Sequence, residues 1–112
     1  MSFDLTTIVD DLKLGAIDAA KGVAASMLAE AAKDATEFVE MSLPALARCT
    51  TLYLTKQITE DEFKSLVLGL RDLAEMNALT LAGLAEIKID ETRNAILKIV
   101  SNIAIGAASK FI

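Results

Sequence analysis

Apolar residues recur every three or four positions along most of this chain, and a single proline, Pro44, interrupts the pattern. This spacing is typical of amphipathic helices. Ala, Leu, Glu and Lys are abundant and favour helix formation. The chain has no Asn-Gly or Asp-Gly turn and no convincing alternation of apolar and polar residues, so strand signals are nearly absent. The sequence therefore predicts an all-α protein, with residues 1–112 forming one domain.

Capping signals divide the pattern into four predicted helices. The clearest start is Thr59, which with Glu62 forms the pattern of a capping box. Asp4 and Asp90 are the expected caps of the first and last helices. The predicted helices span residues 4–41, 43–57, 60–87 and 90–111. Because the connections between them are short, consecutive helices are expected to be antiparallel neighbours.

Pro44 decides the form of the first helix. Its ring clashes with the carbonyl of Glu40 and removes one hydrogen bond, so the helix either ends there or kinks and continues. The expected fold is thus an antiparallel bundle of three to four helices, with a long N-terminal helix kinked or broken near Pro44.

Long uncharged runs indicate more apolar surface than one copy can cover. Three runs carry no charge, residues 22–29, 76–85 and 99–109, and Arg48 is the sole charge between Glu40 and Lys56. A helix that is apolar on all sides is expected to be buried on all sides. A helix over residues 4–41 would be about 57 Å long, against about 34 Å for a compact globule of this size. We therefore expect an elongated protein that self-associates side by side, because the runs lie in the middle of the predicted helices.

The expected contact between copies involves small and apolar residues. Gly15, Ala19, Gly22, Ser26 and Ala29 leave one face of the first helix nearly smooth, which favours close packing, although alanine also simply favours helix. The candidate interface residues are Gly22, Val23, Ser26, Met27, Ile103 and Ala107.

The residues needed for most enzymatic chemistry are missing. The chain has no histidine, which excludes Ser-His-Asp and Cys-His nucleophiles and His-containing metal sites. No glycine-rich phosphate loop is present. Acidic pairs such as Asp34 with Glu37 are interpreted as solvated helix surface, and Cys49 as a partly buried apolar thiol. No catalytic residue, cofactor or metal site is predicted.

Two polar residues are candidate anchors for a ligand or an ion pair, namely Arg48 and Asn77. Arg48 could hold a ligand carboxylate or phosphate, pair with a glutamate, or extend to water. Asn77 interrupts the apolar stripe of the third predicted helix, as Asn102 does in the fourth. Such residues can fix register, line a cavity or lie exposed at a helix edge.

The charge balance narrows the function classes. With 16 acidic and 11 basic residues and no two basic residues adjacent, nucleic acid is a poor partner. The longest uncharged run covers only about 16 Å of helix, half a bilayer core, so an integral membrane protein is not expected. The absence of a signal-peptide pattern at the N-terminus indicates a cytoplasmic protein.

Together these features favour a non-enzymatic, self-associating helical bundle that acts as a structural or protein-interaction module. The alternative is a binding module for an apolar or amphipathic small molecule held in a pocket between helices. A peripheral coat on a membrane or lipid particle is a third class, which the acidic balance disfavours.

Overall fold

The structure is a computed structural model that describes residues 5–110. In this range it contains five α-helices, two short 3-10 helices and no strand, which confirms the prediction of an all-α protein. The elements are η1 (Leu5–Ile8), α1 (Val9–Val23), α2 (Leu28–Leu54), α3 (Glu60–Leu68), η2 (Gly69–Leu73), α4 (Asn77–Leu81) and α5 (Glu86–Ser109). The predicted cap Asp4 and residue 111 of the last predicted helix lie outside the described residues.

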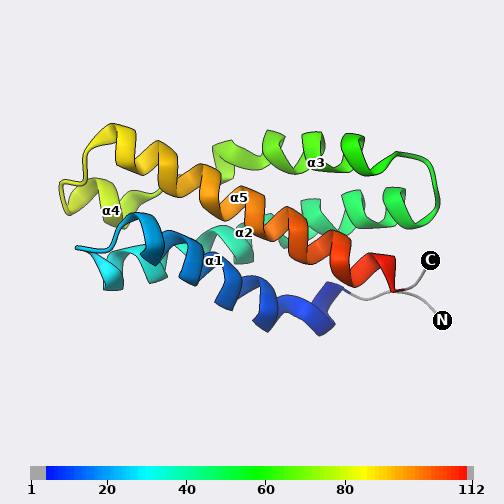
Figure 1. The fold of residues 1–112 in the computed structure, drawn as a ribbon, viewed down its shortest axis with the longest axis horizontal. Helices are drawn as coiled ribbons and strands as arrows, with labels where there is room; N and C mark the ends of the chain where they lie inside the picture. The colour runs from blue at the N-terminus through cyan, green and yellow to red at the C-terminus, as the bar shows by residue number, and fades with distance from the viewer. Residues whose placement is uncertain (1–4, 111–112) are drawn as a thin grey trace.

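The four longer helices form an antiparallel bundle, as predicted (Figure 1). α1 runs from right to left in this view, α2 returns to the right, α3 runs back above it, and α5 crosses the front from left to right. The most extensive helix contacts are those of α1 with α5 and with α2. The short helix α4 lies at the left-hand end, against the beginning of α2.

The predicted first helix over residues 4–41 is wrong, because the chain turns back at residues 24–27. No glycine or proline lies in this turn; Ala24 donates to the Ala20 carbonyl and Met27 to the Ala24 carbonyl. The turn lets α1 pack antiparallel to α2 and buries alanines on both helices, which one straight helix could not do. The molecule measures 44 × 22 × 19 Å and is therefore shorter than the predicted 57 Å helix.

The predicted boundary between helices at residues 41 and 43 is also wrong, because α2 continues through Pro44. Both Pro44 and Glu40, four residues earlier, are exposed. The carbonyl that loses its partner therefore lies on the solvent side of the helix, where water can replace the hydrogen bond. The alternative in which the helix ends at Pro44 is excluded.

The predicted helix over residues 60–87 consists of three pieces. α3 begins with the predicted capping box, in which Glu62 donates its N–H to Thr59 Oγ1 at 3.1 Å and Glu62 Oε1 accepts from the Thr59 N–H at 2.9 Å. It tightens into η2, and the chain then turns at Met76, whose φ is 57°. Four residues after the start of α4, the chain reaches the second turn, centred on Gly83.

Gly83 ends α4 in the left-handed conformation, with φ 89°. Its N–H donates to the Thr80 carbonyl, and the Leu84 N–H donates to the Leu79 carbonyl, both at 3.1 Å. This is a Schellman C-cap, which requires glycine at this position because other residues are strained there. α5 then begins at Glu86, so the prediction that Asp90 caps it is wrong.

One apolar core runs through the bundle. Its largest fully buried side chains come from all of the longer helices and from α4: Leu12, Phe38, Leu46, Phe63, Leu79, Ile96 and Leu97. α1 approaches α5 most closely at Gly15, where a side chain would overlap with Cδ1 of Ile103. In contrast, no atom lies within 4 Å of the position where Gly22 would carry a side chain. The small-residue face of α1 is thus used by α5 at Gly15 and left open at Gly22.

Candidate functional site

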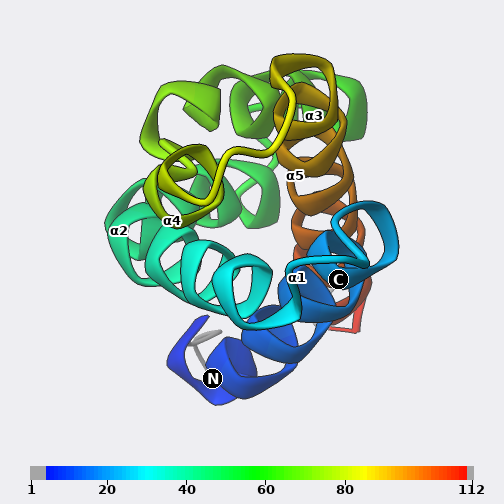
Figure 2. The same ribbon diagram turned by 90° about the vertical axis from the view of Figure 1, so that its left-hand side faces the viewer.

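Two of the three uncharged runs meet at one end of the molecule. Residues 22–29 form the turn between α1 and α2, and residues 76–85 form α4 with the turn that follows it. Figure 2 views this end directly and shows α4 and both turns facing the reader. The runs are therefore not in the middle of long helices, as predicted, but at the places where the chain turns.

The exposed residues at this end are mostly apolar or small. We call this surface the apolar end; it consists of Gly22, Ala25, Ser26, Leu28, Ala29, Leu81, Ala82, Gly83, Ala85 and Ile87. Three of its side chains are large and poorly covered, with 51% of Leu28, 89% of Leu81 and 69% of Ile87 exposed. Large exposed apolar surfaces of this kind often mark interaction sites.

Asp34 fixes the position of α4 within this end. Its side chain extends from α2, and its two oxygens accept the N–H groups of Ala78 and Leu79 at 2.9 and 2.8 Å. These amides belong to the first turn of α4 and have no partner inside that helix. Asp34 is only 3% exposed, so the interpretation of this residue as solvated surface is wrong. The carboxylate therefore caps a helix that lies more than forty residues further along the chain.

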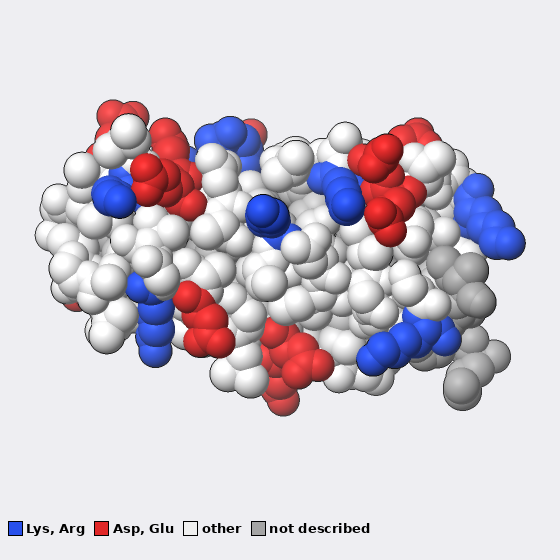
Figure 3. All heavy atoms as spheres, in the orientation of Figure 1, with Lys and Arg blue, Asp and Glu red and all other residues white. Residues whose placement is uncertain are grey.

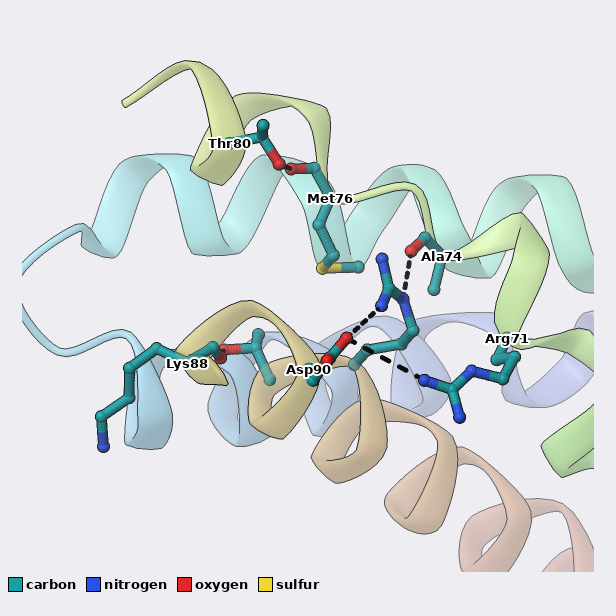
Figure 4. A network of polar contacts seen from close by, with 8 residues as sticks. Arg71, Ala74, Met76, Thr80, Lys88 and Asp90 are labelled. Carbon is teal, nitrogen blue, oxygen red and sulfur yellow. Dashed lines mark hydrogen bonds and ion pairs between the residues drawn. The ribbon is translucent and has the colours of Figure 1, made fainter. Parts of the chain in front are cut away.

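Arg93 holds the segment before α4 against α5 (Figure 4). Its Nε donates to the Ala74 carbonyl at 2.7 Å, and its Nη1 donates to Asp90 Oδ1 at 2.6 Å. Arg71 Nη2 approaches the same Asp90 oxygen at 3.9 Å. Ala74 and Met76 are both buried, so this segment is anchored by packing as well as by charge. The apolar end is thus supported from α2 by Asp34 and from α5 by Arg93.

A second feature is a groove of about 380 Å³ between α3 and α5, which we call the α3–α5 groove. Its lining consists of Lys64, Leu68, Asn94, Leu97, Lys98, Ser101 and Asn102. Buried Leu97 forms part of its floor, while both lysines are exposed. The groove lies in the body of the bundle and shares no residue with the apolar end.

Charges are interspersed over the surface. On the face shown in Figure 3, acidic and basic side chains alternate along the molecule, with broad uncharged areas between them and a mainly uncharged left-hand tip. The ion pairs of the described residues join exposed or partly exposed side chains, such as Lys13 with Glu40 at 3.4 Å. Pairs of this type contribute little to stability.

The structure separates the two predicted anchor residues. Arg48 is exposed on the second half of α2 and forms no hydrogen bond or ion pair within the described residues. Asn77 is exposed at the start of α4 and donates to Glu75 Oε2 at 3.0 Å. Because α4 packs near Asp34, fourteen residues before Arg48, the two anchors are about 21 Å apart along α2 and share no site.

The predicted interface residues fall into two groups. Gly22 and Ser26 are exposed at the apolar end, and the neighbouring Val23 and Met27 are half-buried. Ile103 and Ala107 are half-buried in the last turns of α5, where Ile103 packs against the chain's own core. The run 99–109 is therefore largely covered by the same copy, because α5 packs along α1.

Cys49 is buried, and burial raises the pKa of its thiol above the ordinary value of 9.0, an effect that the neighbouring Arg48 partly opposes. A buried thiol with a raised pKa is a poor nucleophile. Among residues 5–110 no group of three or more acidic or cysteine side chains is arranged to hold a metal ion. In the same part of the chain, no helix is both long enough and apolar enough to cross a membrane.

The chain matches no protein-family model, and comparisons with curated proteins and with solved structures find no significant similarity. Its function is therefore inferred from its own geometry.

Proposed function

We propose that this protein is a non-enzymatic, self-associating helical bundle that acts as a structural or protein-interaction module, and that a second copy binds at the apolar end. The observation that carries the proposal is the gathering of two uncharged runs, with Leu28, Leu81 and Ile87 exposed, at one end of an otherwise charge-covered molecule.

Charge favours a second copy at this place. Each copy has a net charge of −5, so two copies repel each other when their acidic surfaces meet. The runs 22–29 and 76–85 contribute no charge, and the charges beside them, such as Lys21, Glu30 and Lys88, are of both signs. A symmetric contact, with the same surface on both copies, therefore brings together apolar residues without placing like charges opposite each other.

The expected association is weak. Covering the exposed parts of Leu28, Leu81 and Ile87 on both copies would contribute about 6–12 kcal/mol before costs. Bringing two proteins together costs about 4–15 kcal/mol in lost freedom. Since gain and cost are similar, we expect a dimer that dissociates on dilution.

The test is the molar mass in solution, measured by light scattering across a dilution series. The wild-type chain should change from dimer to monomer as it is diluted. Leu81→Lys should be monomeric throughout, because it places like charges at the contact, and its folded state should be unaffected, since Leu81 is already exposed. The matched control is Leu66→Lys, which changes an exposed leucine of α3 outside the apolar end and should dimerise like the wild type.

Two outcomes would contradict the proposal. A wild-type chain that stays monomeric at every concentration removes self-association. A Leu81→Lys variant that dimerises as the wild type does places the contact elsewhere.

A cytoplasmic location is part of the proposal. It is supported by the single cysteine, Cys49, which is buried and has no second cysteine in the chain to pair with. Disulfide-bonded frameworks are typical of secreted proteins. Cell fractionation tests this location.

A further inference from the structure

We propose that the α3–α5 groove binds a small amphipathic molecule with a carboxylate head and an unbranched apolar chain. The groove is independent of the apolar end, so this site and the proposed self-association can be tested separately. Its volume, about 380 Å³, lies at the lower end of the 300–1,000 Å³ range of small-molecule sites. An occupant of modest length therefore fits it.

Ser101 provides the first argument, because its hydroxyl is buried without a hydrogen-bond partner. The side chain is 5% exposed, lines the groove, and is the one buried side chain in residues 5–110 with an unpaired oxygen or nitrogen. A buried polar atom without a partner is unfavourable, and such atoms are rare in native proteins. A ligand oxygen in the groove would give the Ser101 hydroxyl the acceptor that it lacks.

The other buried hydroxyls show that this is not a general property of the helices. Ser42, Thr50 and Thr92 are also buried, and each donates to the carbonyl three or four residues earlier, at 3.2, 2.7 and 2.7 Å. Ser101 is in the interior of α5 and has the same kind of carbonyl four residues earlier, at Leu97, but no bond to it is formed. The Ser101 hydroxyl is thus available to a molecule in the groove.

Charge supplies the second argument. Lys64 and Lys98 line the groove and no carboxylate does, although acidic residues outnumber basic ones in the whole chain. Lys98 forms no ion pair within the described residues, while Lys64 has an exposed partner, Glu60, at 3.4 Å. Two ammonium groups beside an unpaired hydroxyl are suited to an anionic head, and charged hydrogen bonds are stronger than neutral ones.

The rest of the lining determines the remainder of the ligand. Leu68 and Leu97 offer apolar surface next to the lysines, so a head held by Lys98 and Ser101 would direct its chain along these leucines. The amides of Asn94 and Asn102 are exposed and can bind the head or water. A peptide helix would need a longer apolar groove than this one. A single-chain carboxylate satisfies both the charge and the apolar lining.

The experiment is a titration of the ¹⁵N-labelled protein with dodecanoate below its micelle-forming concentration, followed by amide chemical shifts. We expect saturable 1:1 binding with the largest shifts at Lys98, Ser101 and Asn102. Dodecanol, which has the same chain without the charge, should bind at least tenfold more weakly. Absence of saturable shifts in the groove, or equal affinity for the alcohol, would overturn the proposal.

Two exposed leucines of α3 provide a matched pair of variants. Leu68→Glu places a carboxylate in the lining of the groove and should weaken dodecanoate binding at least tenfold. Leu66→Glu adds the same charge to the same helix outside the groove and should change the affinity less than threefold. Equal losses in the two variants would show that binding depends on net charge alone and would reject the site.

Two further variants test the polar contacts. Lys98→Gln and Ser101→Ala should each weaken binding about tenfold or more, while both remain folded by circular dichroism. If Ser101→Ala does not fold, the decision rests on Lys98→Gln and on Leu68→Glu, since both of these side chains are exposed. Because the groove and the apolar end share no residue, Leu81→Lys should bind dodecanoate like the wild type, even if dimerisation is lost.

Discussion

Asp34 shows how one side chain can decide the course of the backbone far away from it. Helix α4 has five residues, which is too short to be stable by itself. Its first-turn amides are held by a carboxylate of α2, and the backbone enters the helix through Met76 in the left-handed conformation. Asp34 therefore stabilises both the short helix and the surface that this helix presents.

Removing this carboxylate should be costly. We expect Asp34→Ala to lower the free energy of unfolding by about 2–4 kcal/mol, because two buried amides lose a charged acceptor. The measurement is urea unfolding followed by circular dichroism. Glu37→Ala, an exposed carboxylate three residues later on α2, is the control and should change stability by less than about 0.5 kcal/mol. Equal effects would mean that Asp34 is not a cap.

Cys49 makes stability depend on pH in the alkaline range. Since burial raises the pKa of its thiol in the folded protein, the unfolded chain releases this proton first as the pH rises. The contribution to stability is fully present below the ordinary pKa of 9.0 and is lost as the pH rises through the raised value. Urea unfolding of the wild type should therefore lose stability faster above about pH 9 than unfolding of Cys49→Ala. Parallel pH profiles would contradict this expectation.

Among the helices, the contact between α1 and α5 depends on a fitted pair of residues. Gly15 on α1 leaves room for Ile103 of α5, whose Cδ1 occupies the place that a side chain at position 15 would need. Glycine inside a helix costs about 1 kcal/mol relative to alanine. The chain thus gives up some helix stability at Gly15 in order to bring α5 close.

A double-mutant cycle tests this pairing. Gly15→Ala alone should gain little or lose stability, because the new methyl group displaces Ile103. In the Ile103→Val background, which lacks Cδ1, the same change should stabilise the protein by about 1 kcal/mol. We expect a coupling energy of about 0.5–2 kcal/mol from unfolding curves of the four proteins. Gly22→Ala, at an open position of the same helix, should be indifferent to the Ile103 substitution.

At the scale of the whole molecule, the turns concentrate exposed apolar residues at one end while the charges cover the body. A contact formed there should depend on apolar burial more than on ion pairs. It should also join two copies through their ends, in contrast to the side-by-side association expected from the sequence.

Salt distinguishes these two kinds of contact. Raising the salt concentration to about 0.5 M screens surface charges. The dimer dissociation constant should stay constant or decrease, because repulsion between two copies of net charge −5 is weakened while the apolar contact persists. Sedimentation velocity at low and high salt measures it, with molar mass as the common readout. A dimer that dissociates in salt would instead indicate a contact based on ion pairs.

The amino-acid sequence by itself determined the helical class, the antiparallel arrangement, the capping box at Thr59 and the uncharged character of residues 22–29 and 76–85. These features depend on neighbours within a few positions, and local pattern is sufficient to predict them. Gly83 was also a usable local signal for the end of α4, since a Schellman cap needs glycine.

Only the tertiary structure decided where the helices turn and which surfaces remain free. The turn at residues 24–27 has no breaking residue and exists because α1 packs back onto α2. The cap of α4 comes from Asp34, the groove combines residues of α3 and α5, and the unpaired hydroxyl of Ser101 depends on what surrounds it. Each of these joins residues distant in sequence, so the spacing of residues along the chain contains no record of them.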